Sequence, residues 1–510
     1  MTTKKEDSGN PSLLHNWLSL AGMVLAGSSF FAVTLLFAMD FSRGSGNPYV
    51  GILTYIVAPA FLIAGLVIVA AGAIRERRHR RRLVPGELPA LPRIDLNVAR
   101  QRRIFLVVSI VTAIFLLFTA VGSYQTYQFT ESVSFCGTTC HTVMKPEYTA
   151  YQQSPHARVR CVQCHIGPGA SWFVKSKLSG VYQVYATLAG SYEHPIPTPL
   201  ENLRPARETC EQCHWPGAFF GAAERTFEHY FPDEWNSPWT IRMLVAVGGG
   251  DPRLSSGGGI HWHMAVGNTI EYVATDDARQ FIPWVRVTDQ HGNVTVYEAD
   301  SGSLSPEQVA AAQPRTMDCI DCHNRPAHDY GSPVSAVNLA LESGRLDATL
   351  PLIKAQAVLA LTGDYSTTAD AMRAIEDSLT AFYEGNYPDL VAATPTLLSG
   401  AVAETQRIYS QSFFPEMGVA WSVYPNNLGH MNFPGCFRCH DGKHASADGK
   451  VISHECNACH VIIAQGEPGA LETSVGGLDF RHPVDIPEGW QDVVCSQCHT
   501  GAGAGLRRGG

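Results

Sequence analysis

The sequence has no cysteine that stands alone. Its 14 cysteines form seven pairs, and a histidine follows the second cysteine of every pair. Disulfide frameworks and zinc ribbons also use paired cysteines, but neither requires a histidine at this position. Because only 20 of the 510 residues are histidine, seven such coincidences by chance are negligible. The lack of any remaining cysteine favours one chemistry for all seven pairs.

The spacing of the pairs predicts covalent attachment of haem c. In six pairs two residues separate the cysteines, so the thiols lie one helical turn apart and can add to the two vinyl groups of one porphyrin. The first pair has three intervening residues. We predict seven haems, attached through Cys136, Cys140, Cys161, Cys164, Cys210, Cys213, Cys319, Cys322, Cys436, Cys439, Cys456, Cys459, Cys495 and Cys498. The adjacent His141, His165, His214, His323, His440, His460 and His499 are the expected iron ligands.

Enough histidines remain to supply a second ligand to every iron. The favoured ones lie close to a motif or among aromatic residues and prolines: His156, His229, His263, His328, His430, His444 and His482. His261 is two residues from His263, so on a strand the two would share a face and compete for one site. At the first haem, Met144 could replace histidine as the ligand, or it could pack beside the porphyrin.

Three apolar stretches lack charged residues altogether. They run from Trp17 to Met39, from Tyr49 to Ile74 and from Ile104 to Gly122. Each is long enough to cross a hydrocarbon core of about 30 Å as a helix. The first also lacks the short apolar region and cleavage site of a signal peptide, so we predict a retained anchor.

The basic residues predict the orientation of these helices. Residues 75–103 contain ten arginines, whereas the loop from Asp40 to Pro48 has only Arg43. The arginine-rich loop is therefore expected in the cytoplasm, together with the N-terminus. Everything after Tyr124 then lies outside, which is also where c-type haem is attached. This predicts a multi-pass protein of the bacterial inner membrane, in contact with membrane lipid, with a periplasmic haem region.

The external region lacks an excess of positive charge. Residues 1–123 carry a balance of +7, and subtracting this from the overall −9 leaves −16 for the rest of the chain. Nucleic acid is therefore not an expected partner. An acidic surface can simply be solvated, or it can receive a basic redox partner.

These features predict a mainly α fold with sparse secondary structure, because haems would fill much of the core. The expected parts are a membrane domain at 1–123, a haem domain at 124–220, a β-containing insertion at 221–310 and a second haem domain at 311–510. Apolar residues alternate from Trp284 to Val287 and from Val294 to Tyr297, which predicts a hairpin. Residues 335–409 have helical periodicity.

The segment from Phe135 to Trp215 resembles the NapC/NirT family of membrane-anchored multihaem quinol dehydrogenases. The residues that carry the resemblance are Phe135, Cys136, Cys140, His141, Met144, Lys145 and Pro146, then Ser154, Pro155 and His156, then Cys161, Cys164, His165 and the helix from Lys175 to Tyr185. The ordinary family member has one anchor and four haems. The whole chain is similar to larger seven-haem inner-membrane cytochromes that serve respiration ending outside the cell.

The resemblance implies oxidation of menaquinol beside the first haem, with electrons passing from the quinone pool to periplasmic or outer-membrane cytochromes. In the family, a lysine and an acidic residue on the helix after the second motif act at the quinol site. Lys175 and Lys177 can fill the first role, but Gln183 occupies the acidic position. Glu147 is an alternative proton acceptor, or an ordinary surface carboxylate.

Two kinds of feature are missing that other functions would need. No motif has lysine in place of its histidine, as a reductase of nitrogen or sulfur oxyanions commonly does to leave an open iron. No signalling domain follows the last motif, which disfavours a haem-based sensor. Electron flow in the opposite direction, into quinone, is an alternative that the sequence leaves open.

Overall fold

The computed structural model describes residues 13–14, 16–43, 58–80, 96–139, 141–200, 203–215, 219–248, 259–265, 267–486 and 493–501. The chain forms two compact units. The first comprises residues 1–131 and 166–182, and the second comprises residues 132–165 and 183–510.

Long helices make up the first unit. They are α1 (Trp17–Arg43), α3 (Ala58–Arg80), α4 (Ala99–Thr130) and the first part of α7 (Ala170–Ala189). Among the described residues, two segments are long and apolar enough to cross a membrane, Trp17–Thr34 and Ala58–His79. They correspond to the first two predicted spans, although the start of the second prediction, residues 49–57, lies outside the described residues.

The third predicted span, from Ile104 to Gly122, lies within α4. This helix is continuous over 32 residues, but it is not one of the two candidate spans found among the described residues. Residues 111–123, which form its centre, lie outside the described side chains. The structure therefore gives two candidate spans rather than three, and the third stays a prediction.

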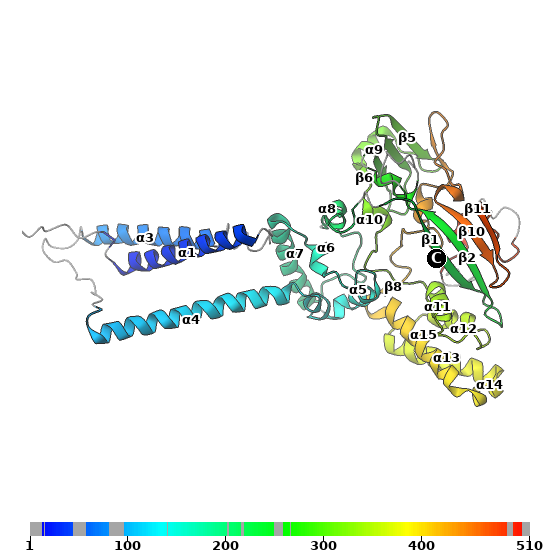
Figure 1. Cartoon of the computed structure of the whole chain (residues 1–510), viewed down its shortest axis with the longest axis horizontal. Coiled ribbons are helices and arrows are strands. Elements are labelled where there is room, and N and C mark those ends of the chain that lie inside the picture. Colours follow the sequence, from blue (N-terminus) through cyan, green and yellow to red (C-terminus); the bar gives the residue numbers. More distant parts are fainter. Residues whose placement is uncertain are drawn as a thin grey trace, which may run out of the picture. The chain divides into compact units, whose positions relative to one another are not determined.

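Small residues let α1 and α3 pack against each other (Figure 1). A Cβ added at Gly65 would lie 2.6 Å from the backbone nitrogen of Ala26. At the end of the pair, Ser19 donates a hydrogen bond to the carbonyl of Val69 at 3.2 Å. Close approach of backbones at small residues, with polar side chains bonded across the pair, is typical of helices that associate in lipid.

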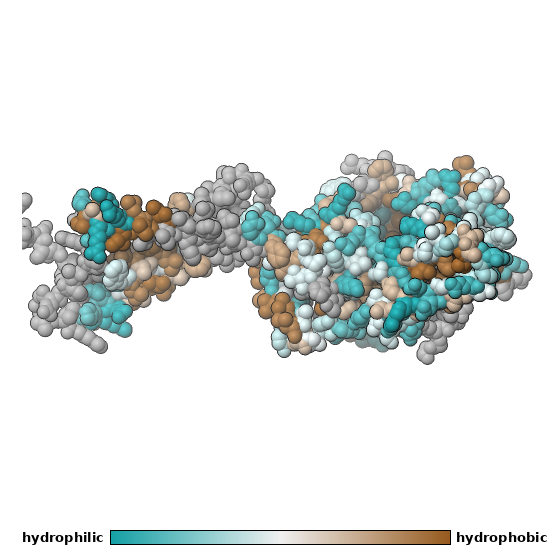
Figure 2. All heavy atoms as spheres, turned by 90° about the horizontal axis from the view of Figure 1, so that it is seen from below, coloured by the Kyte–Doolittle hydropathy of each residue, from teal (hydrophilic) through white to brown (hydrophobic). Residues whose placement is uncertain are grey.

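The outward faces of these two helices are apolar. Phe30, Phe31 and Phe61 are all more than half exposed, and hydrophobic side chains gather over this part of the chain in Figure 2. Exposed apolar area of this kind is stable in contact with lipid chains and costly in water.

The second unit contains helices and two larger sheets. Its helices are α5 (His141–Gln153), α6 (Cys161–His165), α8 (Ala206–Cys210), α9 (Pro306–Ala312), α10 (Cys319–Cys322), α11 (Pro333–Glu342), α12 (Ile353–Leu361), α13 (Thr368–Asn386), α14 (Pro388–Ala393) and α15 (Pro395–Ser412), with the short helices η2 (Phe135–Thr139), η5 (Ile260–Met264), η6 (Pro415–Met417), η7 (Gly435–Arg438), η8 (Cys456–Ala458) and η10 (Cys495–Gln497). Its strands are β1 (Ala222–Tyr230), β2 (Pro238–Ala246), β3 (Thr269–Val273), β4 (Trp284–Thr288), β5 (Val294–Ala299), β6 (Arg315–Thr316), β7 (Phe413–Phe414), β8 (Val419–Ala420), β9 (His444–Ser446), β10 (His460–Gly466) and β11 (Glu472–Leu478).

The two larger sheets join segments that are far apart in the sequence. One has the order β1-β2-β10-β11 and the other β6-β3-β4-β5-β9. Strands β4 and β5 form the hairpin that the alternation of apolar residues predicts. Because β2 pairs with β10 and β5 pairs with β9, a boundary at residue 310 does not separate two bodies.

The expectation of sparse secondary structure was wrong. The chain is 48% helical, and helices α11, α12, α13 and α15 build a conventional apolar core. Val337, Leu346, Ile353, Ile375 and Leu379 in this core are almost fully buried. The haem motifs leave a long cysteine-free segment, and its helical periodicity is sufficient to form a core without porphyrin.

We expect replacement of Gly65 by leucine to weaken the pairing of α1 and α3, because the side chain would meet the backbone of Ala26. Overpacking of this kind typically lowers the free energy of unfolding by about 1–3 kcal/mol. Unfolding of the full chain in mixed detergent micelles would measure the loss. Gly27→Leu is the matched control, since a Cβ at Gly27 meets nothing within 4 Å. Equal losses in the two variants would contradict this account of the packing.

Candidate functional site

Short helices carry the six regular motifs. In four of them the backbone N–H of the motif histidine donates to the carbonyl of the first cysteine, at 2.8–3.0 Å: His214, His323, His440 and His499. This turn places the imidazole beside the two thiols. The local sequence thus fixes one face of each site, as the spacing predicts.

Each of these six motif histidines lies against a second histidine. The pairs and their ring-centroid distances are His165 and His328 (6.1 Å), His214 and His156 (6.0 Å), His323 and His261 (6.3 Å), His440 and His263 (5.8 Å), His460 and His430 (6.2 Å), and His499 and His482 (6.0 Å). Every pair except His499 and His482 joins elements that are separated in the chain by other secondary structure.

These distances fit two imidazoles that bind one iron. Two metal–nitrogen bonds of about 2.0 Å, with about 1.2 Å from each nitrogen to its ring centre, place the centroids about 6 Å apart. Directly stacked rings without an intervening atom can approach more closely. Burial lowers the pKa of His165, His263 and His328, which favours the neutral imidazole that metals bind.

Backbone carbonyls hold many of these rings by the nitrogen Nδ1. The contacts are His156 to Pro326 (3.0 Å), His261 to Val247 (3.1 Å), His263 to Ile260 (2.9 Å), His328 to Glu147 (3.0 Å), His440 to Ser453 (2.8 Å) and His482 to Val484 (2.8 Å). A hydrogen bond at Nδ1 fixes the tautomer and leaves Nε2 for a metal.

Five of the seven histidines favoured from the sequence therefore lie against a motif histidine. His444 does not fit the predicted role, because both ring nitrogens are engaged. Its Nδ1 contacts Asp441 at 2.8 Å and its Nε2 contacts the carbonyl of Ile282 at 2.7 Å. The ring instead connects the turn after the fifth motif to the neighbouring sheet.

His229 also lies in a different environment. It is 3.5 Å from the side-chain amide of Asn338, which in turn accepts a hydrogen bond from Lys354 at 2.6 Å. Burial, followed by the charges of Lys354 and His499, lowers the pKa of His229 to about 4. Burial lowers the pKa of Lys354 to about 8. Among the described residues, no ring contact joins His229 to a motif histidine, although His499 is near enough for its charge to act on this ring.

His261 is the histidine that the sequence argument left out. On a strand, His261 and His263 would share a face and compete for one site. The segment is instead the 3₁₀-helix η5, which has three residues per turn, so residues two apart point in different directions. His261 therefore faces His323, and His263 faces His440.

The first motif differs in its backbone. Cys136 lies in the π-helix η2, which is wider than an α-helix and accompanies the extra residue of this motif. Gly137 lets η2 pack directly on the ring of Tyr148 in α5. Met144 is half-buried on α5. Cys140 and the side chain of His141 lie outside what the structure describes, so the ligands of this site stay a prediction.

Thiols of successive motifs are neighbours. A hydrogen bond with Cys136 lowers the pKa of Cys161 to about 7, and a hydrogen bond with Cys319 lowers the pKa of Cys210. Burial raises the pKa of four further thiols. The charge of a thiol from an adjacent motif adds to this increase in each of the four. These neighbours are Cys164 and Cys210, Cys322 and Cys436, Cys459 and Cys436, and Cys495 and Cys456. The motifs therefore follow one another in space in the order of the sequence.

Of the four residues predicted for a quinol site, Lys175, Lys177 and Gln183 lie on α7 and Glu147 lies on α5. Lys177 forms an ion pair with Glu131 at 3.0 Å, and the carboxylate is only 2% exposed. Lys175 lies 4.7 Å from the centre of the Trp172 ring, and Gln183 is exposed on α7. Glu131, at the end of α4, was missed because its position before the first motif gives no signal in the sequence.

Glu147 lies in the second unit, among residues of the fourth motif. Its carboxylate contacts Arg325 at 3.4 Å and Nδ1 of His328 at 3.2 Å. The side chain is 16% exposed, so it is not the solvated surface carboxylate that the sequence allowed.

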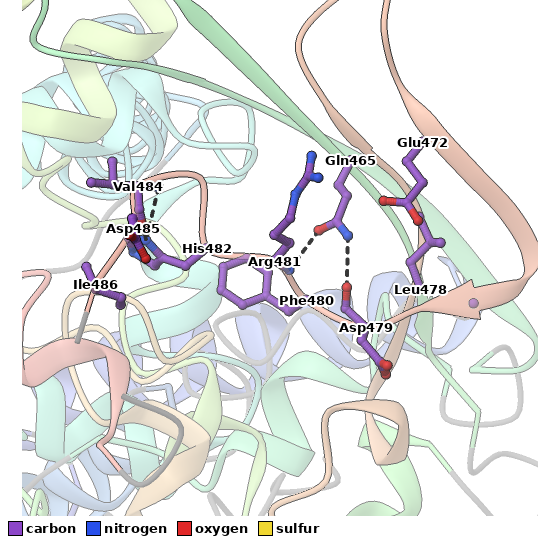
Figure 3. A pocket seen from close by; sticks show the side chains of 11 residues that line it. Gln465, Glu472, Leu478, Asp479, Phe480, Arg481, His482, Val484, Asp485 and Ile486 are labelled. Atoms are coloured by element: carbon purple, nitrogen blue, oxygen red, sulfur yellow. Dashed lines mark hydrogen bonds between the residues drawn. The ribbon is translucent and has the colours of Figure 1, made fainter. Parts of the chain in front are cut away.

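A polar cavity of about 540 Å³ lies beside the last histidine pair (Figure 3). His482 and Asp485 line one end, and Glu472 lies at the other end, on β11. Asp479 adds a third carboxylate, and Arg481 is the one basic residue among the eleven that line the cavity. This surface is acidic and lies next to the seventh motif.

Comparison with known proteins identifies the family. The sequence profile described as the N-terminal region of the NapC/NirT cytochrome c family matches residues 99–197. The cytochrome c-type protein ImcH of Geobacter sulfurreducens is 46% identical over 489 residues, which cover 96% of both chains. The chain belongs to the ImcH family of c-type cytochromes. No solved structure matches it.

Membership in this cytochrome c family implies covalently bound haem c, electron transport and association with a membrane. The residues fit such cofactors. Among the described residues, the ring centres of His430 and His460 lie 6.2 Å apart. This separation would let the two imidazoles bind one iron between them.

We expect His261→Ala to open one coordination position on the haem of the fourth motif. A high-spin signal equivalent to one haem should appear in the electron paramagnetic resonance spectrum of the oxidised protein. His444→Gln is the matched control, because this ring is fully hydrogen-bonded within the protein. A high-spin signal in His444→Gln and none in His261→Ala would reverse the assignment.

Proposed function

We propose that the chain is a membrane-bound quinol dehydrogenase. It oxidises menaquinol and passes the electrons through seven c-type haems to acceptors in the periplasm or outside the cell. The observation that carries the proposal is the row of six histidine pairs, each built on a CxxCH motif, in a chain of the ImcH family. When bound, the haems accept the electrons one at a time and conduct them along the row.

In this proposal, the two histidines of each pair would hold the iron of one haem, for haems two to seven. Iron with two imidazole ligands has no open position, so it transfers electrons and does not bind a small substrate. This disfavours a reductase of nitrogen or sulfur oxyanions. The order of neighbouring thiols, from Cys136 and Cys161 to Cys456 and Cys495, supports a single path from the first haem to the seventh.

We assign the quinol-binding role to Lys177 and Glu131. The buried carboxylate lies five positions before Cys136 in the sequence, at the end of α4. A buried carboxylate next to a lysine is a suitable acceptor for a proton, because its charge is held in place and water has little access. The side chain of Lys177 is 44% exposed, so its ammonium can still contact an oxygen of the substrate.

The exposed face of α7 gives a lipid-soluble substrate a route to this pair. Large apolar side chains that are 64–84% exposed follow the helix: Leu178, Val181, Tyr182, Tyr185 and Leu188. A helix with such a face lies in the membrane interface. Quinol in the bilayer can therefore reach Lys177 without crossing water.

Menaquinol loses two electrons and two protons and becomes menaquinone, and the bound haems would receive the two electrons. Glu131 takes the two hydroxyl protons in turn, passing the first to water before it takes the second, and Lys177 orients the quinol oxygen. Both protons leave to water on the outer side of the membrane, if the arginine-rich loop at residues 75–103 is cytoplasmic.

We further propose that electrons leave at the seventh haem to a basic periplasmic or outer-membrane cytochrome. The carboxylates of Glu472, Asp479 and Asp485 line the cavity beside His482. Complementary charge steers such encounters and makes them sensitive to salt. The rate of oxidation of the reduced protein by a lysine-rich cytochrome should fall as ionic strength rises. A rate that does not depend on salt would contradict electrostatic docking.

The purified holoprotein should be reduced by a menaquinol analogue, with all seven haems reducible by dithionite. Glu131→Gln should lower the maximal rate of quinol-dependent reduction about 100-fold, because it removes the proton acceptor. The KM for quinol should change little, and Glu131→Asp should restore part of the rate.

Glu224→Gln is the matched control, because Glu224 also pairs with a basic residue, Arg242, but on the exposed surface of β1 and β2. If the wild-type protein is not reduced by quinol while dithionite still reduces it, the proposed function fails. If quinol reduces the wild-type protein and reduces Glu131→Gln at the same rate, the proposed function stands and the assignment of the proton acceptor fails.

A further inference from the structure

A largely buried ion pair, Glu147 and Arg325, lies next to the histidine pair of His165 and His328. Glu147 on α5 contacts Nδ1 of His328 at 3.2 Å through its carboxylate and at 3.0 Å through its backbone carbonyl. Arg325 contacts the same carboxylate at 3.4 Å. The side chains of Arg325 and Glu147 are 8% and 16% exposed. His328 faces His165, so this ion pair lies next to the site of the second haem.

This environment differs from those of the other paired rings. In the described part of the chain, the Nδ1 contacts of His156, His261, His263, His440 and His482 are to neutral backbone carbonyls. Among the contacts described for the paired rings, His328 also has a carboxylate at Nδ1. The sequence argument considered Glu147 as a proton acceptor for quinol, and its contacts indicate a different role.

Arg325 is held rigidly in this position. Its Nε donates to the carbonyl of His328 at 2.7 Å. Its guanidinium lies 4.5 Å from the ring centre of Tyr424 and 5.2 Å from that of Tyr330. The positive charge is therefore fixed beside the carboxylate by packing, and the two charges act on His328 from defined positions.

We propose that Glu147 and Arg325 set the reduction potential of the second haem through His328. The inference rests on the haem ligation proposed above and is independent of quinol oxidation. Glu147 acts as a positioning residue, since it touches the ligand and not the iron.

The sign of each effect follows from charge. A carboxylate 3.2 Å from Nδ1 places negative charge beside the imidazole and makes it more electron-donating, and this stabilises ferric iron and lowers the potential. The guanidinium withdraws part of that negative charge and so raises the potential. Removal of Glu147 should therefore favour the ferrous state, and removal of Arg325 should favour the ferric state.

The test is a spectroscopic redox titration of the full-length holoprotein. In Glu147→Gln, the equilibrium constant for reduction of one haem should rise about tenfold. This corresponds to a rise of about 59 mV in its reduction potential, for a one-electron couple. In Arg325→Gln, the same haem should shift in the opposite direction. Arg325→Lys keeps the charge and should restore most of the wild-type potential. A purely structural role would not give shifts of opposite sign.

His328→Ala identifies the haem, because its low-spin signal in the electron paramagnetic resonance spectrum should be replaced by a high-spin one. Glu404→Gln is the matched control, since this buried carboxylate pairs with Arg345 and Arg407 and contacts no histidine. Unchanged potentials in Glu147→Gln, or a shift at a haem other than the one altered by His328→Ala, would overturn the proposal. An unaltered spectrum of His328→Ala would overturn the ligation on which it rests, while quinol-dependent reduction would still test the function separately.

Discussion

An iron that holds two imidazoles fixes their rings about 6 Å apart, and the structure meets this constraint six times with histidines from separate segments. His165 precedes β1, and His328 follows β6. His263 on η5 precedes the helical core in the sequence, and His440, which it faces, follows that core. The fold must therefore bring these segments together before a haem can be held on both faces. This requirement explains why strands from residues 222–299 pair with strands from residues 444–478.

Buried polar contacts hold the motifs to this frame. Asp321 lies inside the fourth motif and is 2% exposed. Its carboxylate accepts hydrogen bonds from the hydroxyl of Tyr272 on β3, at 2.7 Å, and from Arg315 on β6, at 2.9 Å. Ion pairs of this kind contribute little net stability when buried, but they fix geometry. The motif is thus attached to the five-stranded sheet, whose strand β3 follows η5 in the chain.

The helices of the first unit must associate by other interactions, because the hydrophobic effect does not drive association between helices in lipid. Helices α1 and α3 pack through Gly22, Gly65 and Gly72, and the apolar side chains that remain face outward. The ion pair of Lys177 and Glu131 belongs to the same unit, where a carboxylate is expensive to bury without a partner. Burial of the Glu131 carboxylate costs free energy of desolvation even with Lys177 beside it. A buried charge with this cost is consistent with a role in proton transfer.

The sequence alone determined the chemistry of the cofactor, since two thiols and a histidine at fixed spacing act within one helical turn. It also determined the hairpin of β4 and β5, the helical segment and the first two apolar helices, because each depends on local periodicity. It could not determine which histidines pair, because that depends on the direction of rings brought together by distant segments. For this reason the tertiary structure places His261 against a motif histidine and gives His444 other contacts. The partners of Glu131 and Glu147 were likewise decided only by the tertiary structure, since burial and charge contacts arise when α4 meets α7 and when α5 meets the fourth motif.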